Sequence, residues 1–233
     1  MPSLEVCLTP ELIHLYPPKG KTVVVVDILR ATSCMVTALS EGIESITPVA
    51  TVEECEALGQ QGYLTAGERG GQKVESFDLG NSPLSYLEQD YSGRKLAMTT
   101  TNGTLAISKS KGADKVLIGA FLNLSALTGT LSLNDNDLLI LCSGWKGKVS
   151  FEDTLFAGAL CSRLSDQYEM TCDSGQIALA QYEHYKTDLL AAIKHSSHYQ
   201  RLSKLGTIKD FAFCVEVDRY EVVPRLEGEV LVK

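Results

Sequence analysis

The most regular feature of the chain is a short apolar run followed by a segment with helical spacing, and this pair repeats. Residues 21–27 (KTVVVVD) hold four consecutive valines, so a strand there has no polar face, as expected for a strand covered on both sides. Residues 31–41 place apolar residues in pairs at helical spacing, and Gly42 follows as a stop signal. This alternation predicts a mainly parallel sheet with helices on both faces.

The same pattern continues to residue 164. Strands are predicted at 21–27, 45–49, 63–66, 95–100, 115–118 and 137–142. Helices are predicted at 31–41, 51–60, 83–89, 103–110, 123–131 and 152–164. A capping box over 51–54 marks one helix start, and the pair Ser82 and Pro83 marks another. Residues 67–81 are polar, rich in glycine and without periodicity, which predicts a long loop.

The pattern changes after residue 166. Residues 173–195 are predicted as one long helix, and short β-rich runs follow at 212–217, 220–223 and 230–232. No Gly/Ser-rich linker divides the chain, so a single domain over residues 1–233 is expected. The predicted fold is an α/β protein, a three-layer α/β/α sandwich with a mainly parallel sheet and a short mixed or antiparallel C-terminal extension.

Composition and charge narrow the classes of function. The 233 residues carry 21 Lys and Arg against 29 Asp and Glu, a net charge of −8. No basic block is present of the kind that binds nucleic acid or anionic membranes. The apolar runs are far shorter than the roughly 20 residues that span a bilayer, and the start lacks a signal-peptide pattern, so a cytoplasmic location is expected. The seven cysteines lack zinc spacings and are expected to be reduced core residues.

Candidate chemistry lies directly after the predicted strands, because ligands bind at the carboxyl ends of the strands in an open parallel sheet. Asp27 ends the most apolar strand, with Arg30 and Thr32 in the next turn. A carboxylate there is costly to desolvate unless a cation or several donors meet it. Two interpretations stay open: a metal ligand or nucleophile beside an anion clamp, or a helix N-cap with Arg30 on the surface.

The segment 67–71 (GERGG) offers opposite charges between glycines that let the backbone approach a ligand closely. Arg69 suits bidentate contact with phosphate, carboxylate or sulfonate, and Glu68 stands beside it. The alternative is a solvated turn with a surface ion pair. The same predicted loop ends near Asn81, which the capped helix after it does not explain.

The turn at 99–104 predicts an anion site on physical grounds. Its threonines, Asn102 and Gly103 lie where a strand leads into a helix, so hydroxyls and free backbone N–H groups converge there. The alternative is a threonine-rich N-cap. Glu152 and Asp153 open a later helix as dipole-complementing acids or metal ligands. Adjacent carboxylates point in different directions, so we expect at most one to face the site, and His198 is the histidine that could reach it.

The chain also resembles a known family, the 2-phosphosulfolactate phosphatases. The resemblance rests on ordered blocks spanning nearly the whole chain: VVVDILRATS (24–33), AGERGG (66–71), FDLGNSP (77–83), TTNGT (100–104), CSG (142–144) and FEDTLFAG (151–158). Ser197, His198, Asp210 and Cys214 are similar as well.

This resemblance implies an α/β/α sandwich and Mg²⁺-dependent hydrolysis of 2-phospho-3-sulfolactate to 3-sulfolactate and phosphate. In methanogenic archaea that step serves coenzyme M synthesis. The expected catalytic residues are Asp27, Glu68 and Arg69. The expected Mg²⁺ ligands are Asp27, Glu68 and Asp153. The expected substrate-binding residues are Arg30, Thr32, Asn81, Thr100, Asn102, Gly103 and Thr104.

Several alternatives stay open at this point. Asp27 either attacks phosphorus to form an aspartyl-phosphate or binds a metal that activates water. Two rival functions are a phosphatase for another small phosphorylated hydroxy acid and a non-catalytic anion-binding module. The expected partner is a small anionic phosphorylated substrate, with no nucleic acid and no membrane. A homodimer is compatible with a chain of this size.

Overall fold

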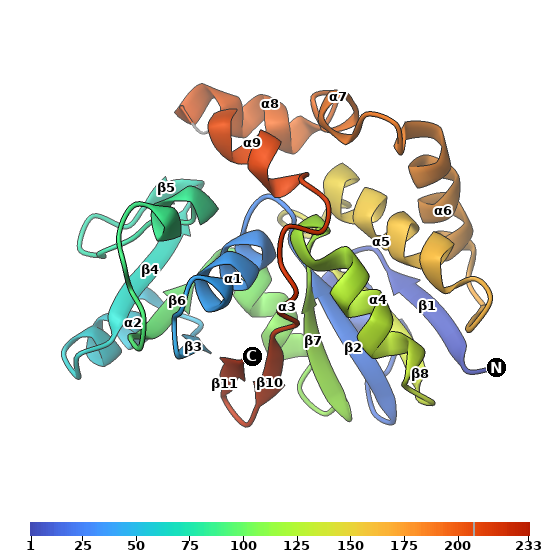
Figure 1. Ribbon diagram of the computed structural model, residues 1–233, viewed down its shortest axis with the longest axis horizontal. Helices are drawn as coiled ribbons and strands as arrows, with labels where there is room; N and C mark the ends of the chain where they lie inside the picture. The colour runs from blue at the N-terminus through green and yellow to red at the C-terminus, as the bar shows by residue number, and fades with distance from the viewer. Residues whose placement is uncertain (207) are drawn as a thin grey trace.

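A mixed sheet of 11 strands runs through the molecule (Figure 1), and the computed structural model describes residues 1–206 and 208–233. The strand order is β5-β4-β6-β3-β11-β10-β7-β2-β8-β1-β9. The strands are β1 (Ser3–Cys7), β2 (Lys21–Val26), β3 (Ser45–Pro48), β4 (Leu64–Arg69), β5 (Gln72–Lys73), β6 (Lys95–Thr99), β7 (Lys115–Gly119), β8 (Asp137–Cys142), β9 (Glu169–Met170), β10 (Arg225–Glu227) and β11 (Val230–Val232).

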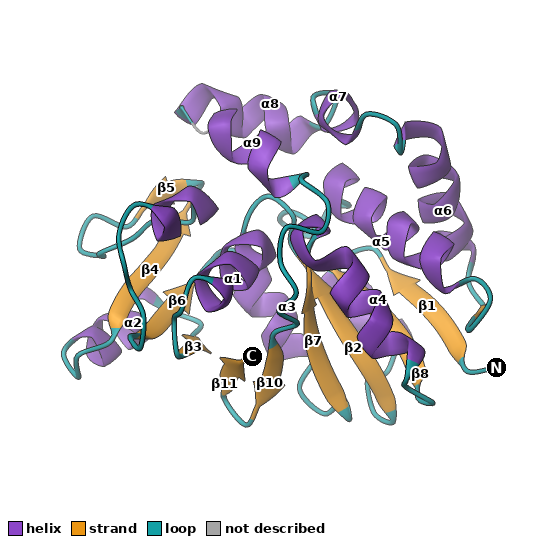
Figure 2. Ribbon diagram, in the orientation of Figure 1, coloured by secondary structure: helices purple, strands orange, loops and turns teal. Residues whose placement is uncertain are grey.

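Helices flank this sheet (Figure 2). The α-helices are α1 (Ala31–Ser40), α2 (Val52–Gly59), α3 (Gly103–Lys109), α4 (Leu124–Ser132), α5 (Phe151–Leu164), α6 (Asp173–Tyr185), α7 (Leu189–Ile193), α8 (Ser197–Leu202) and α9 (Ile208–Cys214). Short 3₁₀ turns lie at Pro10–Leu15, Pro83–Leu87, Phe121–Asn123 and Ser203–Leu205. None of the helices in the described part of the chain is long and apolar enough to cross a membrane.

The sheet consists of two parallel blocks joined by a hairpin. Strands β3, β6 and β4 pair parallel in one block, and β7, β2, β8, β1 and β9 pair parallel in the other. The hairpin β10–β11 is antiparallel and pairs antiparallel with β7 on one side and β3 on the other. The prediction of a mainly parallel α/β sheet is therefore confirmed. The antiparallel extension is also present, in the middle of the sheet.

The interior position of β2 follows from its sequence. Val23 to Val26 are fully buried, and Val24 is in register with Leu117 of β7 and Ile140 of β8. Each buried side chain of this size contributes on the order of 1.5–3 kcal/mol of transfer free energy. The strand therefore anchors the centre of one block and fixes the position of the residue that follows it, Asp27.

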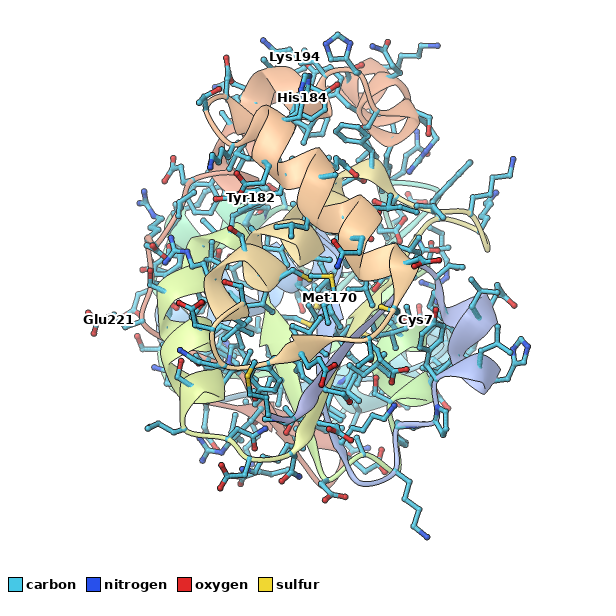
Figure 3. The ribbon with its side chains drawn as sticks, turned by 90° about the vertical axis from the view of Figure 1, so that its right-hand side faces the viewer. Cys7, Met170, Tyr182, His184, Lys194 and Glu221 are labelled. Atoms are coloured by element: carbon cyan, nitrogen blue, oxygen red, sulfur yellow. The ribbon has the colours of Figure 1, made fainter. Side chains whose placement is uncertain are left out.

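At the far side of that block, α6 packs closely on α5. A Cβ placed on Gly158 of α5 would lie 2.0 Å from the carbonyl oxygen of Ala178, so only glycine permits this approach. Figure 3 looks onto this face and labels Tyr182 and His184 on α6. The same view shows Cys7 and Met170 below them, at the β1–β9 edge of the sheet.

Several predicted elements are wrong near the C-terminus. The run 212–217 is not a strand, because Ile208–Cys214 form α9 with Phe211 and Phe213 buried. Residues 220–223 form no strand, whereas 230–232 do, as β11. The long helix 173–195 is interrupted after Tyr185, and the carboxylate of Asp188 accepts a hydrogen bond from the backbone N–H of Ala191 to begin α7. The aromatic and β-branched residues of 212–217 indicate a segment that packs against the core, and a buried helix such as α9 meets that requirement as well as a strand does.

The predicted loop 67–81 begins three residues too early and contains a second short strand. Strand β4 extends to Arg69, and β5 pairs antiparallel with it. The chain then returns at Leu79, which forms a parallel bridge with Ala66. This segment is therefore built onto the edge of the sheet.

The C-terminal helices α8 and α9 lie above α1 (Figure 1). The loop between β4 and β5 approaches α8 at Gly71, which has a φ of +90°. A Cβ there would lie 2.8 Å from the Leu202 side chain. Glycine at this position thus meets both the backbone conformation and the close approach of α8.

Candidate active site

A polar pocket lies where the ends of β2, β4, β6 and β8 meet the C-terminal helix α8. Its lining residues are Asp27, Leu29, Arg30, Glu68, Gly70, Gly71, Asn81, Thr101, Asn102, Trp145, Lys146, His198, Arg201 and Leu202. The pocket thus brings together five of the sequence-predicted site residues: Asp27, Arg30, Glu68, Asn81 and Asn102. Their sequence positions span both parallel blocks of the sheet.

Asp27 is the buried acid of this pocket, with 6% of its surface exposed. Its Oδ1 accepts a hydrogen bond of 3.2 Å from the backbone N–H of Ala31. Burial raises the pKa of Asp27 to about 6; His198 and the Ala31 N–H act to lower it, while Glu68 and Glu152 add to the rise. Asp27 therefore accepts from the first backbone N–H of α1, although the N-cap position itself is Arg30, and it also lines the pocket. Its role as a metal ligand or nucleophile stays a prediction.

Thr32 supports Asp27 through the backbone. Its hydroxyl donates to the carbonyl oxygen of Asp27 at 2.9 Å and accepts from the N–H of the same residue at 3.0 Å. Thr32 is fully buried and does not line the pocket. The structure thus shows Thr32 holding the β2–α1 turn, and its predicted substrate contact stays a prediction.

Arg30 is buried and forms an ion pair with Asp210 of α9. Asp210 also accepts a 2.7 Å hydrogen bond from the Ser82 hydroxyl. A second guanidinium nitrogen of Arg30 donates to the carbonyl oxygen of Gly71 at 3.4 Å. The surface position considered for Arg30 is wrong: its charge lies in the pocket wall, already paired with a carboxylate from near the C-terminus. Ser82, predicted as a helix cap, uses its hydroxyl in this pair instead.

Glu68 joins two strand-end turns. Its Oε2 accepts from the backbone N–H of Gly71 at 2.6 Å, and its Oε1 accepts from that of Thr101 at 2.7 Å. The side chain is buried and lines the pocket. Both oxygens thus hold the β4 and β6 turns together beneath the site.

Arg69, predicted as catalytic, does not line the pocket. Its guanidinium donates to the carbonyl oxygen of Glu68 at 2.8 Å, to the Thr99 hydroxyl at 2.9 Å and to the carbonyl oxygen of Ala50 at 3.3 Å. The structure therefore gives Arg69 a bracing role between β4 and β6.

Thr100 and Thr104 satisfy one another. The Thr104 hydroxyl donates to the carbonyl oxygen of Thr100 at 2.8 Å, and the Thr104 N–H donates to the Thr100 hydroxyl at 3.2 Å. These two residues line a separate groove of about 400 Å³ rather than the pocket. The alternative of a threonine-rich cap accounts for both hydroxyls.

Asn102 and Gly103 belong to the same turn; Asn102 lines the pocket, and Gly103 lies beside Asp27 without lining it. The side-chain oxygen of Asn102 accepts from the backbone N–H of Lys146 at 3.3 Å. A Cβ on Gly103 would lie 2.5 Å from the Ala31 Cβ and 3.0 Å from Asp27 Oδ2. Gly103 thus lets α3 pass beside the Asp27 carboxylate.

Asp153 and Glu152 face different partners, as expected for adjacent carboxylates. Asp153 accepts from the backbone N–H groups of Ile28 at 2.9 Å and Gly144 at 3.1 Å. Burial, together with the charges of Asp27 and Glu152, raises the pKa of Asp153 well above its usual range. Asp153 therefore ties the end of β2 to the end of β8.

Glu152 is fully buried, and its Oε1 lies 2.6 Å from Nδ1 of His198. Burial acts to raise the pKa of Glu152, but the hydrogen bond and charge of His198 outweigh it, so this pKa is lowered. Glu152 is the acid of this pair that connects to a pocket side chain. The sequence analysis selected Asp153 of this pair as a site residue and did not predict the contact between Glu152 and His198.

Trp145, Lys146 and Arg201 also line the pocket and were not among the predicted site residues. The Arg201 guanidinium carbon lies 4.7 Å from the Trp145 ring centroid, and Lys146 Nζ lies 5.2 Å from it. Burial lowers the pKa of Arg201, although Glu68 acts to raise it. Two cations thus stack on one indole at the pocket wall. The sequence signal for Trp145 and Lys146 was their position between two glycines directly after the strand β8.

Three residues that line the pocket carry a buried polar side-chain atom without a hydrogen-bond partner. Within the described residues these atoms are Asn81 Oδ1, Thr101 Oγ1 and Arg201 Nε. Such atoms are rare in folded proteins because each carries a desolvation cost. A bound ligand would complete the hydrogen bonds of these three groups.

Few side chains in the pocket are placed to bind the predicted Mg²⁺ ion. Among the described residues, no group of three or more His, Cys, Asp or Glu side chains is arranged to hold a metal ion. Mg²⁺ is often held by one or two carboxylates together with phosphate oxygens and waters. Of the three predicted ligands, Glu68 and Asp153 each use both oxygens on backbone amides. Asp27 uses Oδ1 on one amide, so an ion in that form would have Asp27 as its protein ligand, and this stays a prediction.

The fold and the pocket define an α/β protein with a mixed-charge site, suited to a small anion, at the ends of its parallel strands. The sequence profile of the 2-phosphosulpholactate phosphatase family matches residues 7–229. The chain therefore belongs to this family, which confirms the predicted resemblance and the predicted class of enzyme.

Curated relatives agree over most of the chain. A "Probable 2-phosphosulfolactate phosphatase" of Thermotoga petrophila is 41% identical over 216 residues, covering 93% of this chain and 93% of the relative. Proteins with the same name from Caldanaerobacter subterraneus subsp. tengcongensis and Clostridium acetobutylicum are 39% and 40% identical. They cover 91% of this chain and 90% and 93% of their own lengths, respectively.

Proposed function

We propose that this protein hydrolyses 2-phospho-3-sulfolactate to 3-sulfolactate and phosphate. The observation that carries the proposal is the pocket in which the buried carboxylate of Asp27 lies among Arg30, Lys146 and Arg201. A non-catalytic anion site needs the cations but has no use for a desolvated carboxylate among them. Membership of the phosphatase family supports the same reaction.

The charges of the substrate suit this pocket. The substrate carries a phosphate, a carboxylate and a sulfonate, while the protein has a net charge of −8. Attraction must therefore come from local positive potential. Arg201 and Lys146 offer that potential at the indole of Trp145, and Arg30 offers a planar donor group deeper in the wall. We assign the phosphate to the Asp27 end and the acid groups to Arg201 and Lys146.

Phosphoryl transfer depends on positioning and on charge stabilisation. Asp27, held by Ala31 and Thr32, acts at phosphorus either as the nucleophile or by orienting water. Glu68 fixes the Gly71 and Thr101 turns around the transferred group. If bound, Mg²⁺ held by Asp27 would neutralise charge on the phosphate oxygens.

The biological setting forms part of the proposal. We infer a step in sulfolactate metabolism of the coenzyme M type, carried out in the cytoplasm by a homodimer without nucleic acid or membrane partners. The 2-phospho-3-sulfolactate assignment itself is favoured over another phosphorylated hydroxy acid because two cations beyond Arg30 line the pocket.

Phosphate release tests the proposal directly. Release from 2-phospho-3-sulfolactate with Mg²⁺ should exceed release from 2-phospholactate, and excess EDTA should abolish it. Asp27→Asn should remove turnover while the unfolding temperature stays close to that of the wild type. The control Asp166→Asn, at an exposed position, should match the wild type in both turnover and unfolding temperature. No phosphate from either substrate in the folded protein would reject the phosphatase assignment. Equal rates on both would reject the narrow substrate.

A further inference from the structure

His198 enters the pocket from α8 and is held by a buried carboxylate. It is 8% exposed and lines the same pocket as Asp27. Its Nδ1 lies 2.6 Å from Oε1 of Glu152, a residue with no exposed surface. Within the described residues, Nε2 of His198 has no hydrogen-bond partner. A histidine fixed at one nitrogen by a carboxylate keeps the other nitrogen oriented for proton transfer.

The surroundings fix the ring in place. The Trp145 ring lies with its centroid 6.4 Å from that of His198, at an interplanar angle of 31°. The backbone N–H of Tyr199 donates to the Ser196 side chain at 3.0 Å, which caps α8 just before the histidine. His198 is thus held by its helix, by an aromatic neighbour and by Glu152.

The proposed reaction needs a proton donor that the mechanism above does not supply. Breaking the bond between phosphorus and the ester oxygen leaves an alkoxide, a poor leaving group unless it is protonated as the bond breaks. Asp27 acts at phosphorus. Both oxygens of Glu68 accept from backbone amides. The guanidinium groups of Arg30 and Arg201 offer positive charge and hydrogen-bond donors that stabilise anionic oxygens instead.

We propose that His198 is the general acid of the reaction and that Glu152 positions it; this inference rests on the proposed phosphatase function. As oxygen attacks phosphorus and the phosphorus–ester bond breaks, the electron pair of that bond passes to the ester oxygen. Nε2 of the imidazolium gives that oxygen its proton, which yields the free hydroxyl of 3-sulfolactate. The neutral imidazole recovers a proton from solvent when product leaves.

The leaving group provides the test. A nitrophenolate departs without a proton, whereas the sulfolactate alkoxide does not. In His198→Gln, kcat/KM for 2-phospho-3-sulfolactate should fall by about 10²–10³-fold, the range typical of general acids. For 4-nitrophenyl phosphate it should change by less than about threefold. Losses of the same size on both substrates, including losses below detection, would overturn the assignment.

A second readout uses the substrate itself. With ¹⁸O in the bridging ester position, the kinetic isotope effect on kcat/KM should be larger in His198→Gln, since the oxygen then leaves unprotonated. An unchanged isotope effect would overturn the assignment even if the rate falls. The circular dichroism spectrum and unfolding temperature of the variant establish that it is folded.

Glu152→Gln and His195→Gln complete the set. Glu152→Gln should lower kcat on the alkyl ester by a smaller factor than His198→Gln, with KM little changed and the same sparing of 4-nitrophenyl phosphate. His195, exposed and three residues before His198, is the matched control and should leave both rates unchanged. Failure of the wild type to release phosphate would count against the proposed function, while wild-type turnover without leaving-group discrimination in the variants would count against His198 alone.

Discussion

The turn after β2 and the turn after β6 share a plan and differ in how their polar groups are satisfied. Each leads from a buried strand into a helix and carries hydroxyls and charge. After β6, Thr100 and Thr104 bond to each other. After β2, the Arg30 charge is met by Asp210, about 180 residues further along the chain. The comparison indicates that the Thr100–Thr104 pair completes its own hydrogen bonds away from the pocket, whereas Arg30, which depends on a distant carboxylate, lies in the pocket wall.

The largest effect should come from breaking the distant pair of the β2 turn. Arg30→Met leaves the Asp210 carboxylate buried without its ion partner, which should lower the free energy of unfolding by about 3–5 kcal/mol. Urea denaturation monitored by circular dichroism measures this. The double variant Arg30→Met with Asp210→Leu should regain most of the loss. A single-variant loss below about 1 kcal/mol would contradict the buried pair.

The next largest effect concerns Gly103, the glycine at which the β6 turn packs against the β2 turn. Gly103→Ala places a methyl against Ala31 and Asp27 Oδ2, which should cost about 1–3 kcal/mol of stability and lower kcat by displacing the carboxylate. Gly129→Ala in α4, with no atom near the new methyl, is the control and should stabilise the fold by up to about 1 kcal/mol. Full activity in Gly103→Ala would show that Asp27 does not depend on this contact.

A smaller effect is expected in the β6 turn. Thr104→Val removes the two hydrogen bonds that the Thr104 hydroxyl makes with the backbone of Thr100 and should cost about 1–2 kcal/mol, with kcat/KM within about twofold of the wild type. Thr104→Ser retains the hydroxyl and should recover most of the stability. If Thr104→Val instead lowers kcat/KM about 100-fold while remaining folded, the turn is an anion site and the contrast with β2 disappears.

The smallest effect concerns thiols near the two turns. Burial raises the pKa of Cys55, beside β6, to about 11 and that of Cys214, in α9, to about 12. Since the thiolate is the reactive form, roughly 10⁻³ and 10⁻⁴ of these groups are reactive at pH 8, and the fraction rises about tenfold per pH unit up to the pKa. Iodoacetamide labelling followed by mass spectrometry should therefore favour the partly exposed Cys172 at pH 8. Equal labelling of Cys214 would contradict its burial.

The sequence predicted local structure well where a local signal decides it. The strand at 137–142 has the predicted bounds, and the capping box of Thr51 and Glu54 is confirmed with both of its hydrogen bonds. The missed strand β1 alternates Leu4 and Val6 with polar neighbours, a period of two that was available in the sequence. The helix α9 was missed because its aromatic run suits a buried helix as well as a strand.

The residues of the site were easier to predict than their contacts. Asp27 and Glu68 follow strands, so their position at a sheet edge could be inferred. His198 and Asp210 were named from the sequence, but their partners Glu152 and Arg30 were not, and Arg201 was missed. These three residues reach the sheet edge because α8 and α9 fold back over α1, an arrangement set by tertiary packing. Nothing in the local sequence around Arg69 indicates that its guanidinium turns to Thr99 and Ala50. Side-chain direction at a strand end depends on neighbours that are distant in sequence.

The hairpin β10–β11 has a consequence for biosynthesis. It occupies the middle of the sheet, between β3 and β7, yet residues 225–232 are made after every strand that it joins. During translation, all strands of both parallel blocks are therefore synthesised before the hairpin that joins the blocks. Until then, β3 and β7 each expose an unpaired edge of the kind that recruits other chains. Protection of the nascent protein from aggregation thus depends on residues 225–232, which cover both edges.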